Sequence, residues 1–90
     1  MILEKRSGGW WHWCPACEDR HPLPESWDFN GDESRPTFRP SFLQTFHRLH
    51  DRAGVTVRCH YFITEGTIQF LADSWHGRSD IVIMPAIPKD

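Results

Sequence analysis

A run of alternating apolar and polar residues near the middle of the chain constrains the fold most. Val55, Val57, Cys59, Tyr61 and Ile63 alternate with Thr, Arg, His and Phe, and β-branched and aromatic residues dominate the run. Successive side chains of a β-strand point to opposite faces of a sheet, so this period of two predicts a strand. Cys59 and the residue after it, His60, therefore belong to opposite faces.

The dipeptide Glu65-Gly66 follows this strand and precedes a second apolar segment, "TIQFLAD". A two-residue turn with glycine favours a hairpin and fixes the register of its two strands. With the turn at 65–66, the sequence predicts four cross-strand pairs: Ile63 with Ile68, Tyr61 with Phe70, Cys59 with Ala72 and Arg58 with Asp73. His60 would then lie opposite Leu71, and "SWHGRSD" would leave the sheet as a loop.

The remaining segments predict a mostly β fold with little helix. "GGWWHWCPAC" indicates a strand that runs into a tight turn, and "IVIMPAIP" indicates a short apolar strand ended by proline. Residues 41–50 fit an edge strand or a short helix, and we favour the strand because the hairpin needs a neighbour, with "DRAG" as the turn between them. Prolines and Asn30-Gly31 predict turns and extended chain over residues 21–40. We expect one domain over residues 1–90, with residues 1–8 as a flexible N-terminal stretch.

Length and composition limit the stability and the location of such a domain. A chain of 90 residues buries only a small core, even with 39% hydrophobic residues, so we expect an additional stabilising feature. No apolar run approaches the ~18 residues that cross a bilayer, and no signal peptide opens the chain, which favours the cytoplasm. The net charge of −2 neither favours nor excludes a polyanionic partner.

The motif Cys14-Pro15-Ala16-Cys17 supplies half of a metal site. In a reducing compartment a C-x-x-C pair is more often a metal ligand or a redox pair than a structural disulfide. A redox pair usually opens a helix of a βαβ unit, and this sequence has no such pattern around Cys14. We therefore expect a zinc knuckle, in which one turn holds two thiolates against a tetrahedral Zn²⁺ and makes the fold zinc-ribbon-like.

The other half of the site comes from the hairpin and its exit. Cys59 is the best third ligand, with a small buried hydrophobe as its alternative role. For the fourth ligand we order the candidates His76, His60 and His21. His60 faces away from Cys59 in a regular strand, and the "SWHG" loop must fold back for His76 to reach the site. His21 would close the site locally as C-x-x-C-x-x-x-H.

Several motifs together resemble a family of small phage and prophage proteins that carry the label "ammonia monooxygenase", a label we regard as a misnomer. The resemblance spans residues 13–88 and rests on "CPACEDRHPLP", "FNGD", "RPTFRPSF", "CHYFITEGTIQFLADSWHG" and "IVIMP". It implies a zinc-binding β domain of phage origin and no known reaction. Related domains occur with bacterial ubiquitin-like conjugation operons, which implies protein partners. The family's polar motif positions match Cys14, Cys17, His21, Cys59, His60, Asp73 and His76.

For function we favour a zinc-stabilised binding module that engages a protein partner and is not a catalyst. Trp10 and Trp11 are candidate docking residues, because alternate side chains of one strand cannot all be buried. A nucleic-acid-binding alternative rests on the segment from Arg35 to Arg58, in which five arginines are interleaved with phenylalanines. Its candidate contacts are Arg39, Arg48 and Arg58.

An enzymatic alternative is a zinc-dependent hydrolase with an open metal position. His60 or Asp73 would then act as the general base toward a metal-bound water. The competing role for Asp73 is an ion pair with Arg58 across the hairpin.

Overall fold

The computed structural model describes residues 1–47 and 56–88, and every regular element within these ranges is a strand. All neighbouring strands pair antiparallel, in two sheets. The first sheet has the order β1 (Glu4–Arg6), β2 (Gly9–Cys14), β3 (Asp19–Pro24), and the second has the order β4 (Asp28–Phe29), β5 (Phe38–His47), β6 (Thr56–Thr64), β7 (Thr67–Phe70), β8 (Ile81–Ile83). The expected small, mostly β domain is confirmed. The described part of the chain contains no helix that could span a membrane.

The β6–β7 hairpin has the register that its sequence predicts. Tyr61 pairs with Phe70 and Ile63 pairs with Ile68. Glu65 and Gly66 both have positive φ, 47° and 77°, as a two-residue turn of this kind requires. The paired ladder ends at Phe70, so the predicted pair of Cys59 with Ala72 does not form, although Leu71 N–H still donates to the His60 carbonyl at 3.0 Å.

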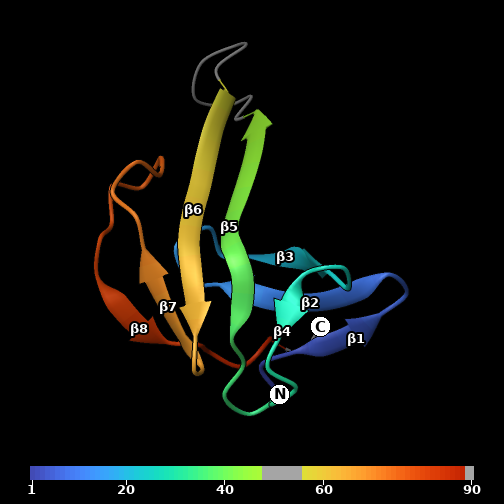
Figure 1. Cartoon of the computed structure of the whole chain (residues 1–90). Coiled ribbons are helices and arrows are strands. Elements are labelled where there is room, and N and C mark those ends of the chain that lie inside the picture. Colours follow the sequence, from blue (N-terminus) through green and yellow to red (C-terminus); the bar gives the residue numbers. More distant parts are fainter. Residues whose placement is uncertain (48–55, 89–90) are drawn as a thin grey trace.

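The core lies between the two sheets. In Figure 1 the three-stranded sheet lies behind β5 and β6, and its strands cross theirs at a steep angle. One face of β6 enters this core, because Cys59, Tyr61 and Ile63 are each at most 1% exposed. Phe38 and Phe70 from the neighbouring strands and Leu23 from the first sheet complete the packing. Such alternation leaves the even-numbered residues of β6 on the outer face of the five-stranded sheet.

Strand β5 confirms the strand interpretation of residues 41–47 and departs from it in one respect. It is not an edge strand along its whole length, because β4 pairs with Phe38 and Arg39. Its register against β6 shifts between Phe38, which faces Ile63, and Phe42, which faces Tyr61. Residues 39–41 of β5 therefore oppose the single residue Phe62, which is a β-bulge, and the Arg39–Pro40 peptide bond within it is cis.

Two other expectations have different outcomes. Asn30-Gly31 does not form a two-residue hairpin turn but lies in the longer loop between β4 and β5, where the Asn30 carboxamide oxygen accepts the N–H groups of Asp32 and Thr37. The N-terminal stretch contributes β1 and the buried Leu3, which is 3% exposed. The "DRAG" turn lies outside the described residues.

Candidate active site

Strand β6 places two groups of chemically active side chains on its two faces. Cys59 is fully buried on the face that enters the core. His60, the next residue, lies on the outer face, where its side chain is 22% exposed. On each face, side chains from other strands and loops lie next to the β6 residue.

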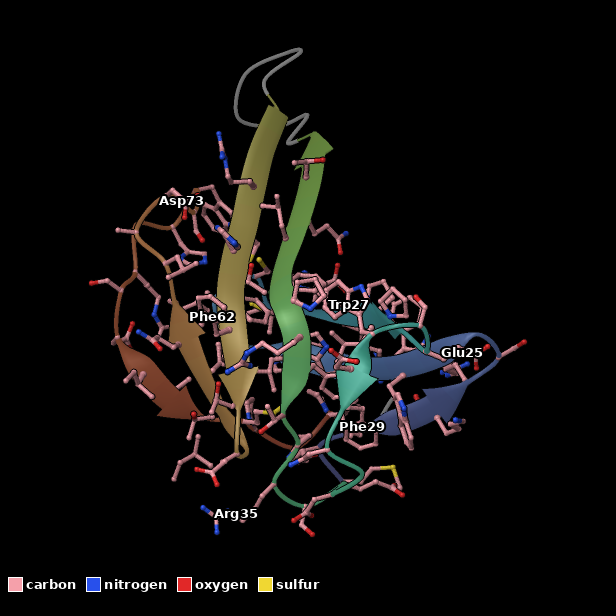
Figure 2. All side chains as sticks on the ribbon, viewed as in Figure 1. Glu25, Trp27, Phe29, Arg35, Phe62 and Asp73 are labelled. Carbon is pink, nitrogen blue, oxygen red and sulfur yellow. The ribbon has the colours of Figure 1, made fainter. Side chains whose placement is uncertain are left out.

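On the outer face, Ser41, His60 and Asp73 form a hydrogen-bonded row. The Ser41 hydroxyl oxygen lies 3.0 Å from His60 Nε2. The other ring nitrogen, His60 Nδ1, lies 3.1 Å and 3.2 Å from the two carboxylate oxygens of Asp73. Figure 2 shows Asp73 on the loop beside β6, next to the strand that carries His60. A hydroxyl, an imidazole and a carboxylate in this order form the arrangement of a Ser–His–Asp catalytic triad.

The charges in this row suit a histidine that accepts a proton from serine. The hydrogen bond from His60 holds the pKa of the Asp73 carboxyl below its usual value, and Arg58, 3.7 Å away, acts in the same direction. An ionised Asp73 accepts a hydrogen bond, so the hydrogen of a neutral His60 ring lies on Nδ1. Nε2 is then free to accept the Ser41 hydroxyl proton.

Ser74 fixes the loop that carries Asp73 against β6. Its hydroxyl oxygen accepts the His60 backbone N–H at 2.8 Å and donates to the His60 carbonyl at 3.1 Å. Trp75 N–H donates to the Arg58 carbonyl at 2.8 Å. These bonds continue the strand pairing beyond the end of β7, and they hold Asp73 within reach of the His60 ring.

The sequence indicates His60 and Asp73 as candidates for catalysis, but it does not indicate Ser41. No local signature marks this serine, because "RPSFL" lacks the glycines of a G-x-S-x-G turn. Its place beside His60 arises from the β5–β6 pairing and from the bulge at residues 39–41. Only the parity of β5 against β6, with Leu43 facing His60, would have placed the two side chains on one face.

On the inner face, three sulfurs meet between the sheets. Cys14 is the last residue of β2, Cys17 lies in the turn that follows it, and Cys59 comes from β6. Their sulfur atoms all lie within 4.8 Å of one another, and Cys14 Sγ is 3.7 Å from Cys59 Sγ. Ligands at about 2.3 Å in a tetrahedron are roughly 3.8 Å apart, so this spacing fits a shared Zn²⁺-sized ion.

The electrostatics of the sulfur cluster also fit a cation. The contact with Cys17 raises the pKa of the Cys14 thiol to about 11, and contacts with Cys14 and Cys17 raise the pKa of Cys59 further. Hydrogen bonds from Cys14 and Cys59, and more weakly from His21, lower the pKa of Cys17. Neighbouring thiols cannot all ionise side by side unless a positive charge lies among them, which a divalent metal would provide.

The three histidines considered as a fourth ligand lie in different surroundings. His76 Nε2 is 3.6 Å from Cys59 Sγ, so the "SWHG" loop does fold back toward the cluster, but His76 is not among the ligand atoms that all lie within 4.8 Å of one another. His21 is buried and its Nδ1 is 3.1 Å from the Tyr61 hydroxyl, which also contacts buried His12. His60 lies on the opposite face of β6, and both of its ring nitrogens have other partners. The sulfur cluster and His60 therefore lie on opposite sides of the sheet, whereas a hydrolase in which His60 deprotonates a metal-bound water would need them on the same side.

The predicted binding residues that the structure describes are divided between the two sheets. Trp10 packs against Phe29 with ring centroids 5.6 Å apart and carries Lys5 over its ring, and Trp11 is half-buried. Arg58 is exposed beside Asp73, and Arg39 lies on the outer face across Phe62. Arg48 lies outside the described residues. Among the described candidates, Arg39 and Arg58 therefore share the outer face of the five-stranded sheet, whereas Trp10 and Trp11 belong to the other sheet.

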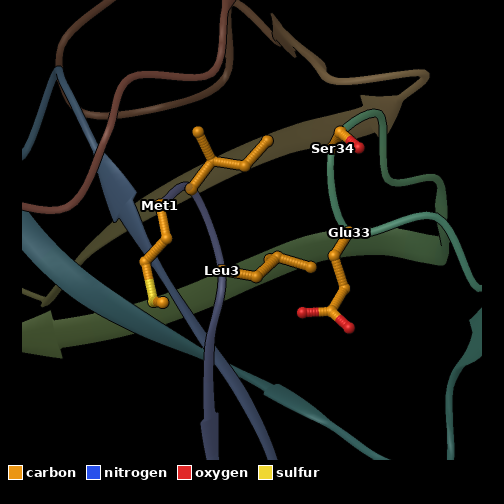
Figure 3. Close-up of a pocket in the computed structure, with 5 residues that line it drawn as sticks. Met1, Leu3, Glu33 and Ser34 are labelled. Carbon is orange, nitrogen blue, oxygen red and sulfur yellow. The ribbon is translucent and has the colours of Figure 1, made fainter.

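Two hollows among the described residues lie away from both groups. One of about 400 Å³ is lined by Met1, Ile2, Leu3, Glu33 and Ser34, as Figure 3 shows. A second, of about 200 Å³, follows the turn between β1 and β2 and the end of β3. The Ser41–His60–Asp73 row lies instead on an open sheet face.

Fold and site together define the class of this molecule: a small two-sheet β protein with a serine–histidine–aspartate row on one sheet face and a cysteine cluster beneath it. A family model described as "Bacterial ubiquitination-like system serine protease (BubE)" matches residues 1–71. Because the match covers most of the chain, the protein belongs to this family. Searches of curated proteins and of solved structures found no match.

The family agrees with part of what the sequence resemblance implied. The link to bacterial ubiquitin-like conjugation is borne out at the level of the family. Phage origin and the identity of the metal stay predictions. Residues 1–71 include Ser41 and His60, whereas Asp73 lies just beyond the matched range.

Proposed function

We propose that this protein is a serine protease of a bacterial ubiquitination-like system, with Ser41 as nucleophile, His60 as general base and Asp73 as the residue that orients His60. The observation that carries the proposal is the continuous row of hydrogen bonds, 3.0 Å from Ser41 to His60 and 3.1 Å from His60 to Asp73. The family description supports the same chemistry. This proposal replaces our expectation of a non-catalytic binding module.

The reaction follows from the positions of the three side chains. Ser41 Oγ attacks the scissile carbonyl carbon while its proton moves to His60 Nε2. His60 then donates that proton to the leaving amine, and the carbonyl re-forms as an ester of Ser41. Water, deprotonated by His60, hydrolyses this ester and regenerates the serine. The Ser41 backbone N–H, at the β5 bulge, is our candidate donor to the developing oxyanion.

The Ser41–His60–Asp73 row lies on an open sheet face, which favours a polypeptide substrate over a small molecule bound in a pocket. The side chains of His60 and Asp73 are 22% and 48% exposed, on the outer face of the sheet. An extended chain can lie across such a face, whereas a small molecule gains most of its affinity from a concave pocket. We therefore propose a protein component of the conjugation system as the substrate.

A fluorophosphonate probe tests the nucleophile directly, because it reacts with an activated serine irrespective of substrate sequence. We expect one probe adduct per chain on Ser41 by peptide mass spectrometry. Ser41→Ala and His60→Ala should each lose the adduct, while Ser26→Ala, at an exposed turn serine, should keep it. Labelling of another serine, or none in the folded protein, would refute the proposed role of Ser41.

We further propose that Cys14, Cys17, Cys59 and His76 hold a structural Zn²⁺. A site with mostly thiolate ligands is usually closed to solvent. The distance of 3.7 Å from Cys14 Sγ to Cys59 Sγ and the distance of 3.6 Å from Cys59 Sγ to His76 Nε2 support this set of ligands. Coordination through His76 Nε2 places a hydrogen on Nδ1, so the bond that Nδ1 accepts from Arg78 N–H would be given up. The metal ties the β2–β3 turn to β6 and to the loop after β7, and it takes no part in the chemical step.

A further inference from the structure

Arg39 is held in one position on the outer face of the five-stranded sheet. Its Nη1 donates to the carbonyls of Phe38 and Ile63, at 2.8 Å and 2.9 Å. Its Nη2 donates to the Thr64 hydroxyl at 3.0 Å, and the guanidinium lies over the Phe62 ring, 5.3 Å from its centroid. An exposed arginine usually samples many rotamers, and this one has lost that freedom before any ligand arrives.

The fixed guanidinium still has donors to offer. A guanidinium has five N–H groups, and the three hydrogen bonds leave the Nε hydrogen and one Nη2 hydrogen. No carboxylate of the described residues forms an ion pair with Arg39, and this includes Asp28, its Cα partner on β4. Nε–H and an Nη–H together match the two oxygens of a carboxylate.

The position of Arg39 relates it to the catalytic row. Phe62 and His60 lie on the same face of β6, two residues and therefore about 7 Å apart. Arg39 lies over Phe62, while Ser41, two residues along β5, contacts His60. Figure 2 shows Phe62 and Asp73 beside the same strand. A group bound to Arg39 would lie roughly two residues of extended peptide from the bond attacked by Ser41.

We propose that Arg39 is a substrate-recognition residue that binds a carboxylate of the substrate about two residues from the scissile bond. This inference rests on the proposed protease function and assigns its specificity. The carboxylate is either an Asp or Glu side chain within the substrate or the carboxylate at the end of the chain. Both present the same pair of oxygens to the guanidinium.

The experiment compares cleavage of a synthetic peptide library by the intact protein and three variants, with products identified by mass spectrometry. The variants are Arg39→Gln, Arg39→Lys and, as the control on the other sheet, Arg6→Gln. Peptides with Glu near the scissile bond are then compared individually with their Gln counterparts, and peptides ending in a free acid with their amides. Fluorophosphonate labelling of Ser41 in every variant reports an intact catalytic row.

We expect kcat/KM for the acidic peptide to exceed that of its Gln counterpart by roughly 10- to 100-fold, as for one charge-assisted bidentate contact. Arg39→Gln should abolish this ratio, Arg39→Lys should keep part of it, and Arg6→Gln should leave it unchanged. A preference confined to free acids over amides would assign the terminal carboxylate. Normal labelling with equal cleavage of acidic and neutral peptides, or an unchanged ratio in Arg39→Gln, would refute the role of Arg39. Absence of labelling in the unmodified protein would refute the protease proposal and this inference with it.

Discussion

Cys59 and His60 are adjacent in the chain and serve different sites. Alternation along β6 sends the thiol into the core and the imidazole to the outer face, so a single peptide bond separates the proposed metal site from the proposed catalytic base. The neighbouring hydrogen bonds then decide what each side chain does. His60 has a hydroxyl on one ring nitrogen and a carboxylate on the other, whereas Cys59 has sulfur and imidazole neighbours.

At this scale we predict that Asp73→Asn lowers kcat by a factor on the order of 10²–10⁴. An asparagine can donate a hydrogen bond to His60 Nδ1 and so favours the wrong ring tautomer. Peptide hydrolysis and the rate of fluorophosphonate labelling measure the effect. Asp80→Asn is the matched control, because Asp80 is similarly exposed and also pairs with an arginine, Arg78. Equal loss of activity in both variants would contradict a catalytic role for Asp73.

The same variant has a pH signature. The pKa of Asp73 is lower in the folded protein than in the unfolded chain, so its ionised form stabilises the fold above about pH 4 and this contribution disappears as the pH falls through the folded pKa. Urea unfolding at pH 5 and pH 3 should therefore show a smaller loss of stability in Asp73→Asn than in the unmodified protein. An identical pH dependence in the two proteins would be evidence against the His60–Asp73 hydrogen bond.

At the scale of the elements, the loop after β7 connects the two sites. Residues 73 to 76 contribute Asp73 to the outer face, Ser74 to the backbone of β6 and His76 to the sulfur cluster. Because this loop lies beyond the last paired residue of β7, its position depends on the contacts of Ser74 with β6 and of His76 with Cys59.

We predict that Ser74→Ala destabilises the fold by about 1–3 kcal/mol, because it leaves the His60 backbone N–H without its partner, while the His60 carbonyl keeps the Leu71 N–H. Activity should fall more than stability alone explains, since Asp73 loses its fixed distance to His60. Ser79→Ala, in the same loop and exposed, is the control. Denaturant unfolding and kcat, measured where both variants are folded, separate the two effects, and an unchanged kcat would limit Ser74 to a structural role.

The elements also show how far the sequence could predict this molecule. The register of the β6–β7 hairpin was predictable. A two-residue turn together with an alternating apolar pattern permits one set of cross-strand pairs, which includes Tyr61 with Phe70. The three members of the cysteine cluster were predictable, because a C-x-x-C pair and one further cysteine in a small β domain are most simply explained as ligands of one metal ion. Ser41 was not predictable, because its contact with His60 depends on a bulge between strands whose connecting residues carry no register signal. The loop position of His76 depended in the same way on tertiary contacts.

For the whole molecule, the cysteine cluster joins the two sheets, as do the hydrogen bonds of Tyr61 with His12 and His21. Cys14 ends β2 of one sheet and Cys17 lies in the turn after it, whereas Cys59 belongs to the other sheet. A structural zinc contributes on the order of 10–16 kcal/mol near neutral pH, whereas the net stability of a domain is about 5–15 kcal/mol. The fold of so small a domain should depend on the metal.

We therefore predict one zinc ion per chain by elemental analysis, and loss of both folded structure and Ser41 labelling on chelation. Circular dichroism and fluorophosphonate labelling measure the two effects, and added Zn²⁺ should restore both. Cys59→Ser should bind less metal and unfold at a lower temperature. A metal-free protein that keeps its spectrum and its labelling would refute the proposed zinc site.

The alternation along β6 also limits how this protein can change over evolutionary time. A substitution alters one side chain, but insertion of one residue between Cys59 and His60 would place the thiol and the imidazole on the same face of the sheet. Either the sulfur would leave the cluster or the imidazole would enter the core, and one of the two sites would be lost. Homologous chains should therefore vary in length in the loops that flank β6 and keep a fixed spacing within it.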